Sequence, residues 1–143
     1  EDMYHIVAHN GVLENHDDLA EDYVIAHLNA VDSSVIPALI GALLEFDEYP
    51  EDTHKTQELS AIEECCSMLK GTFACWIYGK LTGCTYLVRS GSTLYGNINT
   101  GDFSSVPVDN ICEQELEQGI VYCVTNEGLA KCGEFKTNNP FFL

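Results

Sequence analysis

The sequence predicts an α+β fold in which helices pack on an antiparallel sheet. Two stretches of the N-terminal half, residues 35–44 and 57–70, carry apolar side chains at helical spacing. From residue 72 onward the chain changes to short runs rich in β-branched and aromatic residues, separated by Gly, Ser and Asn. A strand-like run precedes the helices, so the order is strand, helices and then consecutive strands. That order is typical of helices laid on one sheet of antiparallel strands.

The first predicted elements are a strand and a short helix. Residues 3–8 are apolar and partly β-branched, which predicts a strand, and residues 9–11 are expected to follow as a turn. Asn15 is expected to cap a helix whose first turn holds Asp17 and Asp18. Carboxylates are favourable there because the N-terminal end of a helix is the positive end of its dipole.

Two longer helices follow. Residues 23–28 fit a strand or a helix equally well, and Asp32 begins the second helix. The acidic segment 46–56 is expected to be a loop. Residues 57–70 form the third helix, and Gly71 is expected to end it in the position after the C-cap, where glycine is common.

The C-terminal half predicts strands joined by short turns. Residues 80–83 are expected to connect one hairpin, and the Asn-Glu-Gly sequence at 126–128 is a strong turn signal for another. We found no internal repeat and no linker. The expected strands are 72–78, 84–89, 93–98, 103–108, 119–125 and 129–135.

The composition indicates one acidic, globular domain, residues 1–143, long enough to bury its own core. Lys and Arg total 6 and Asp and Glu total 23, so the net charge is −17. This charge repels phosphate backbones and anionic lipid, so we expect no nucleic acid and no membrane among its partners. The chain has no apolar stretch long enough to span a bilayer. A solvated acidic surface is the simplest interpretation, and a basic partner or a DNA-mimic role stays open.

The cysteines predict reduced thiols in a cytoplasmic protein. None of the seven is in a C-x-x-C pair, and the histidines have no metal-ligand spacing, so we expect no metal site. No Gly-rich phosphate loop is present, and no cofactor is expected. Four cysteines lie in apolar, strand-like runs, where cysteine behaves as a small hydrophobic residue: Cys75, Cys84, Cys123 and Cys132.

Three features could carry chemistry, and each has a plain structural alternative. The Asn10 amide and the Gly11 N–H stand side by side and could donate to one developing oxyanion, or form an ordinary Asn-Gly turn. Asp32 could hold an ammonium group, or cap a helix. Arg89 is the only arginine, and it could bind a carboxylate, brace a turn or make a structural ion pair.

Five segments carry a combined pattern. His9-Asn10-Gly11 and Asn15 form H-N-G-x-x-x-N, and residues 31–36 read V-D-S-S-V-I. Residues 69–74 read L-K-G-T-F-A, 87–94 read L-V-R-S-G-S-T-L, and 115–122 read E-L-E-Q-G-I-V-Y. In this order they resemble the class II glutamine amidotransferase domain, nearest to the glutaminase domain of glucosamine-6-phosphate synthase.

The resemblance implies an N-terminal-nucleophile hydrolase fold, an αββα sandwich with antiparallel sheets, here N-terminally incomplete. It implies that the Asn10 side chain and the Gly11 N–H form an oxyanion hole, and that Asp32 binds the α-ammonium of L-glutamine. In this family an N-terminal Cys attacks the glutamine amide, and no cysteine of this chain matches it. The nucleophile is therefore expected from outside this chain.

The sequence also departs from the family pattern. Ser34 stands where the family has Glu, and Phe103-Ser104-Ser105 is followed by Val106 in place of an acidic residue. Three interpretations stay open: an active glutaminase completed by a further segment or chain, a catalytically inactive structural or interaction protein, and a sensor that binds glutamine without hydrolysing it. In each, the edge strand 3–8 is expected to pair with another polypeptide.

Overall fold

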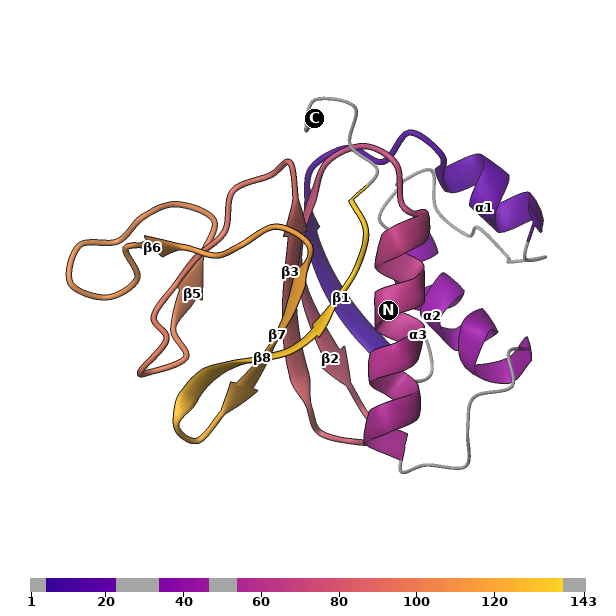
Figure 1. Cartoon of the computed structure of the whole chain (residues 1–143). Helices are drawn as coiled ribbons and strands as arrows, with labels where there is room; N and C mark the ends of the chain where they lie inside the picture. Colours follow the sequence, from indigo (N-terminus) through magenta and orange to yellow (C-terminus); the bar gives the residue numbers. More distant parts are fainter. Residues whose placement is uncertain (1–4, 23–33, 47–53, 138–143) are drawn as a thin grey trace.

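The computed structural model describes residues 5–22, 34–46 and 54–137 (Figure 1). A first strand is followed by three helices and then by strands, as the sequence predicts. The helices are α1 (His16–Asp22), α2 (Val35–Phe46) and α3 (His54–Met68). The strands are β1 (His5–Asn10), β2 (Phe73–Gly79), β3 (Thr85–Ser90), β4 (Tyr95–Gly96), β5 (Phe103–Ser104), β6 (Gln114–Glu115), β7 (Ile120–Thr125) and β8 (Gly128–Glu134).

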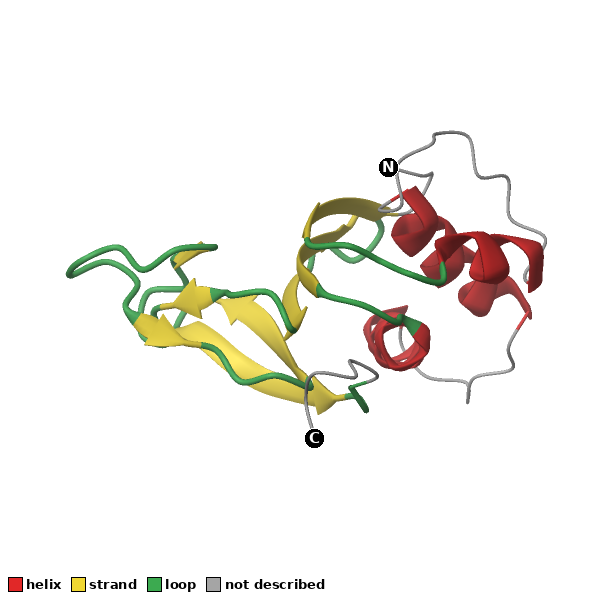
Figure 2. Cartoon of the chain, turned by 90° about the horizontal axis from the view of Figure 1, so that it is seen from above, coloured by secondary structure: helices red, strands yellow, loops and turns green. Residues whose placement is uncertain are grey.

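The strands form two antiparallel sheets. The larger has the order β1-β2-β3-β7-β8, and the smaller has the order β5-β4-β6. The three described helices lie together on one side of the larger sheet, and the smaller sheet lies away from them (Figure 2). The α+β class with antiparallel sheets is thus confirmed. The described residues contribute one helix layer, and neither sheet closes into a barrel.

The register of β1 on β2 assigns the two faces of the larger sheet. Val7 lies opposite Ile77, and both pack toward the helices. Asn10 lies opposite Ala74, and Ala74 belongs to a second apolar cluster. Because successive side chains of a strand point to opposite faces, Asn10 faces away from the helices.

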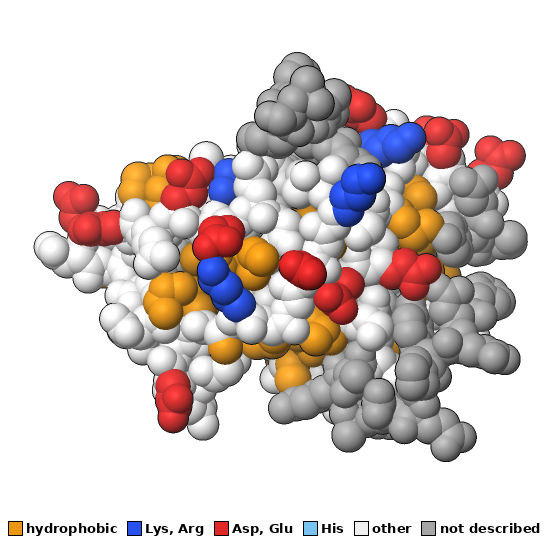
Figure 3. Space-filling model, in the orientation of Figure 1, with side chains coloured by type: hydrophobic (Ala, Val, Ile, Leu, Met, Phe, Trp, Pro, Cys, Tyr) orange, Lys and Arg blue, Asp and Glu red, His pale blue; other side chains and the backbone are white. Residues whose placement is uncertain are grey.

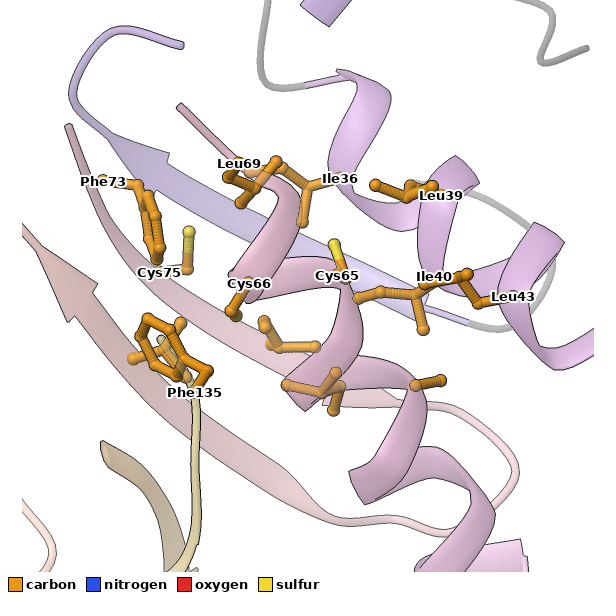
Figure 4. Packing of buried hydrophobic residues seen from close by; sticks show 14 of the residues in the cluster. Ile36, Leu39, Ile40, Leu43, Cys65, Cys66, Leu69, Phe73, Cys75 and Phe135 are labelled. Carbon is orange, nitrogen blue, oxygen red and sulfur yellow. The ribbon is translucent and has the colours of Figure 1, made fainter. Parts of the chain in front are cut away.

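The main core lies between the helices and the larger sheet. Figure 4 shows Leu39 and Ile40 of α2, Cys65 and Cys66 of α3, and Cys75 of β2 among its side chains. These residues are all fully buried, which agrees with cysteine acting as a small hydrophobic residue. Burial raises the pKa of the Cys65 and Cys75 thiols, so both stay protonated at neutral pH.

Several local predictions need correction. Residues 9 and 10 belong to β1 and not to a turn, because Asn10 continues the ladder with Ala74. The third helix ends at Met68, so Gly71 is not its C-terminal cap. Gly71 has φ +117°, and a Cβ there would lie 2.2 Å from the Val12 carbonyl oxygen. Close approach of two backbones is what requires this glycine.

The predicted cap of α1 is also different. The helix forms where expected, but the Asn15 amide nitrogen donates to the Met68 carbonyl (2.8 Å), and the Asn15 amide oxygen accepts from the Lys70 N–H (2.9 Å). Asn15 therefore ties the end of α3 to the start of α1. Residues 3–4, 23–28 and Asp32 lie outside the described residues.

The prediction that all cysteines are reduced is wrong for one pair. Cys123 of β7 and Cys132 of β8 form a disulfide, with their Cα atoms 6.1 Å apart. The two strands are neighbours in one hairpin, so both side chains meet on one face near the irregular pairing at Val121 and Tyr122. The other cysteines are free.

Asp and Glu side chains are scattered over the face shown in Figure 3. No helix within the described ranges combines the length and apolar character that a membrane span requires. Among the described residues, no three His, Cys, Asp or Glu side chains gather as a metal site.

Candidate functional site

Asn10 and Gly11 lie where β1 ends and the chain turns alongside the start of β2. The Thr72 N–H donates to the Val12 carbonyl (2.9 Å), and the Val12 N–H donates to Thr72 Oγ1 (3.1 Å). Two residues further along segment 11–14, the Glu14 N–H donates to the Lys70 carbonyl (2.8 Å). These bonds hold segment 11–14 against segment 70–72. Asn10 and Gly11 are therefore held in place by residues far away in the sequence.

Residue 11 must be glycine because the neighbouring atoms leave no room for a side chain. Its φ is +133°, and a Cβ at residue 11 would lie 2.2 Å from the Thr72 carbonyl oxygen and 2.7 Å from Ser92 Oγ. Most L-residues avoid this φ, and neither neighbour leaves room for a methyl group. The segments 9–15, 69–74 and 87–94 therefore converge on this one glycine.

The variant Gly11→Ala is expected to lower the free energy of unfolding by about 3 kcal/mol or more, because a strained φ and a backbone clash act together. Chemical denaturation measures the loss. Gly83→Ala is the matched control, since Gly83 has φ +71° but open space around it. That variant should cost only about 1–2 kcal/mol. Equal losses in the two variants would contradict the close-packing explanation.

A shallow pocket of about 230 Å³ opens beside Asn10, on the face of the sheet opposite the helices. Its lining includes Ala8 and Asn10 of β1, Trp76 of β2, and the segment Phe103, Ser104 and Ser105. The structure thus brings the Asn10 segment next to the F-S-S segment. Trp76 was not identified from the sequence, because within a strand it has the same pattern as a core residue.

Arg89 proves to be structural. Its Nε donates to the Ser92 carbonyl (2.8 Å), its Nη1 donates to the Leu116 carbonyl (2.7 Å), and its Nη2 pairs with Glu115 Oε1 (3.1 Å). The Gly91 N–H donates to Gln118 Oε1 (2.7 Å) in the same contact. Arg89 therefore braces the 90–92 turn against residues 115–118. Of the three sequence interpretations of Arg89, the structure supports the turn brace and the structural ion pair.

Cys75 is the one cysteine that contributes to the Asn10 pocket. Its side chain is buried among the core residues on the helix side, and that burial raises the pKa of its thiol. A buried, protonated thiol is a poor nucleophile. Asp32, expected to bind substrate, lies outside the described residues, so its position relative to Asn10 is not described.

Many solved structures resemble this chain, and three illustrate the similarity. The glutamine phosphoribosylpyrophosphate amidotransferase of B. subtilis, solved with ADP and GMP, is 23% identical with a TM-score of 0.66, and the match covers 90% of this chain and 29% of that one. An allosteric regulatory enzyme of purine biosynthesis is 22% identical with a TM-score of 0.66, covering 96% and 30%. A glutamine aminotransferase class-II domain protein of Silicibacter pomeroyi is 18% identical with a TM-score of 0.55, covering 92% and 68%.

These similarities define the fold. The chain has a fold of the N-terminal-nucleophile hydrolase type, with antiparallel sheets and helices on one face. More particularly, it has the fold of the class II glutamine amidotransferase domain. It spans under a third of the length of the first two enzymes. No protein-family model and no curated protein sequence matches it.

Proposed function

We propose that this chain is part of a class II amidotransferase domain that releases ammonia from L-glutamine, with the N-terminal Cys supplied from outside the chain. The observation that carries the proposal is the junction at Asn10 and Gly11. Asn10, which carries the side-chain amide, lines a pocket, and Gly11, which carries the backbone N–H, follows it directly. Both lie at a strand end held by long-range hydrogen bonds. An oxyanion hole needs donors of this kind, positioned before the reaction begins.

In the proposed hydrolysis of glutamine, the nucleophile comes from outside this chain and the oxyanion donors come from this chain. The thiolate attacks the glutamine amide carbon, and the carbonyl oxygen becomes an oxyanion that accepts from the Asn10 amide and the Gly11 N–H. Collapse of this intermediate expels ammonia and leaves a thioester, which water then hydrolyses to glutamate. The role of this chain is to stabilise the charge on oxygen in both steps.

Asp32 is proposed to bind the α-ammonium of glutamine. The variant Asp32→Asn removes the charged partner and is expected to weaken glutamine binding by about 1–3 kcal/mol. Titration calorimetry on the assembled protein measures this change. Asp109→Asn is the control, because Asp109 is an exposed carboxylate that does not line the Asn10 pocket. Unchanged binding in Asp32→Asn would remove this residue from the site.

A further polypeptide is proposed to complete the sheet. β1 is an edge strand in the described sheet, and it carries Asn10. Phe103, which lines the pocket beside Asn10, is 38% exposed. An unpaired edge and an exposed aromatic side chain next to the proposed site both suit a segment that adds to this edge and covers the pocket.

The first test is the intact mass of the protein from its native source, with N-terminal sequencing of every chain that co-purifies. A segment or chain that begins with Cys, together with glutamate release from glutamine, would support the proposal. A complex without N-terminal Cys, Ser or Thr would contradict hydrolysis by this mechanism.

The second candidate function is that of a catalytically inactive amidotransferase-like structural or interaction protein. The burial of Cys75 favours it, because this chain by itself places no accessible thiol at the Asn10 pocket. Absence of an N-terminal nucleophile from the purified complex would support this candidate. A cytoplasmic location stays a prediction, and the Cys123–Cys132 disulfide weakens the argument that suggested it.

A further inference from the structure

The seven cysteines fall into two groups by exposure. Four are 0–2% exposed, and the other three are partly exposed and line a single pocket of about 410 Å³ on the larger sheet. This pocket lies apart from the Asn10 pocket and shares no residue with it. The buried cysteines are Cys65, Cys66, Cys75 and Cys112, and the pocket cysteines are Cys84, Cys123 and Cys132.

The strand order places Cys123 between the other two. Cys123 is on β7, which lies between β3 and β8, and Cys132 is on β8. Tyr86 of β3 lies directly opposite Cys123. Cys84 precedes Tyr86 by two residues, so both side chains point to the same face and Cys84 is the diagonal neighbour of Cys123.

The separation of Cys84 and Cys123 suits an exchange of partners. Diagonal neighbours across antiparallel strands have Cα atoms about 7–8 Å apart. A disulfide needs a Cα separation below about 7 Å, so a shift of about 1 Å joins the two cysteines. Cys84 lies just before β3, where its carbonyl accepts from the Gly79 N–H (2.9 Å), so the shift strains this one bond at the end of the β2–β3 hairpin.

Tyr86 adds a polar group beside the free thiol. Its hydroxyl donates to the Glu58 carboxylate, and its side chain lines the same pocket as Cys84. Burial and these neighbours raise the pKa of Tyr86, so its hydroxyl keeps its proton and remains a donor at neutral pH. The single hydroxyl proton of Tyr86 goes to the Glu58 carboxylate, so Tyr86 is an uncharged neighbour of Cys84 in this pocket.

We propose that this pocket is a thiol–disulfide exchange site, in which Cys84 attacks the Cys123 sulfur of the Cys123–Cys132 disulfide. Cys84 loses its proton to solvent, and its thiolate forms a bond to Cys123 Sγ while the Cys123–Cys132 bond breaks. Cys132 leaves as a thiolate and takes up a proton. One disulfide and one thiol are present before and after, so no oxidant or reductant is consumed. The released Cys132 lies on the edge strand β8.

Trapping with N-ethylmaleimide tests this exchange in the full chain without reductant. The protein is labelled at neutral pH, acidified, digested with pepsin and mapped by mass spectrometry without reduction. Wild type is expected to give a Cys84–Cys123 linked peptide, with maleimide on Cys132 in the same molecules. Both signals should be lost in Cys84→Ser and kept in Cys112→Ser, the matched control at a buried free cysteine. Equal labelling of Cys132 in wild type and in Cys84→Ser would overturn the proposal.

A second variant tests whether Cys84 and Cys123 are close enough to form a disulfide directly. In Cys132→Ser the Cys123 thiol is free, and oxidation with diamide is expected to join it to Cys84. Resistance of Cys65 and Cys75 to maleimide shows that the variant is folded, because both are fully buried in the native core. A folded variant in which diamide leaves Cys84 and Cys123 unjoined would also overturn the proposal.

Discussion

Replacement of Asn10 by alanine is expected to reduce glutamine turnover about 10²–10³-fold in the assembled protein, which corresponds to about 3–4 kcal/mol of lost transition-state stabilisation. The proposed contact of its amide is with the oxyanion, which exists only after attack. Glutamine binding should therefore change much less than turnover. Initial-rate measurements of glutamate release, analysed for kcat and KM separately, give the comparison.

Asn126→Ala is the matched control for this experiment. Asn126 is an exposed residue of the β7–β8 turn and does not line the Asn10 pocket. Its replacement should leave kcat and KM unchanged. If Asn10→Ala also left kcat near the wild-type value, Asn10 would be only the last residue of an edge strand, and the proposed oxyanion hole would be wrong.

Replacement of Glu58 by alanine is expected to lower the free energy of unfolding by about 1–3 kcal/mol for each buried hydrogen-bonding group that it leaves unpaired. Glu58 is 4% exposed, and its carboxylate oxygens lie 3.1 Å from His5 Nε2 and 2.8 Å from Thr82 Oγ1. Removing the carboxylate leaves these groups and the Tyr86 hydroxyl without this acceptor. Urea denaturation measures the loss. Glu127→Ala, at an exposed turn residue, is expected to change stability by less than about 0.5 kcal/mol.

The same carboxylate should make stability depend on pH in one direction. Burial raises the pKa of Glu58, but the hydrogen bonds from His5, Thr82 and Tyr86 outweigh burial, so the net pKa is below its ordinary value of 4.5. A group with a lowered folded-state pKa adds stability above its unfolded-state pKa, and this contribution is lost as the pH falls through the folded-state value. The stability difference between wild type and Glu58→Gln should therefore be constant above about pH 5.5 and shrink below about pH 4.5. A difference independent of pH from neutral to acid would exclude this role.

Elements with strong local signals were predicted from the sequence. The apolar spacing of α2 and the turn at residues 126–128 depend on neighbours within a few residues, and both form where expected. β6 was not predicted, because Gln114 and Glu115 are polar and exposed. Its pairing with β4 is supported by Arg89, which contacts Glu115 and Leu116 from a different sheet.

The candidate site was only partly predictable. Asn10 and Gly11 could be identified as donors, and residues 103–105 could be matched to a family segment. That these residues meet at one pocket could not be predicted from the sequence. After β3 the chain leaves the larger sheet to form the smaller one, and only this path brings residues 103–105 beside Asn10 of β1. The Cys123–Cys132 disulfide was likewise missed, because cysteines in strand-like runs are ordinarily buried thiols, and only the hairpin register brings these two together.

The sequence by itself determined the α+β class, the order of the elements, the acidic surface and the residues that resemble an amidotransferase domain. These features follow from local spacing, composition and motif order. The tertiary structure decided that Asn10 ends a paired strand and that Gly11 is required by close packing. It also decided that Asn15 and Arg89 are braces, and that three cysteines share one pocket. The reason is physical: these roles depend on contacts between distant segments, such as residues 9 and 72, which are 63 positions apart.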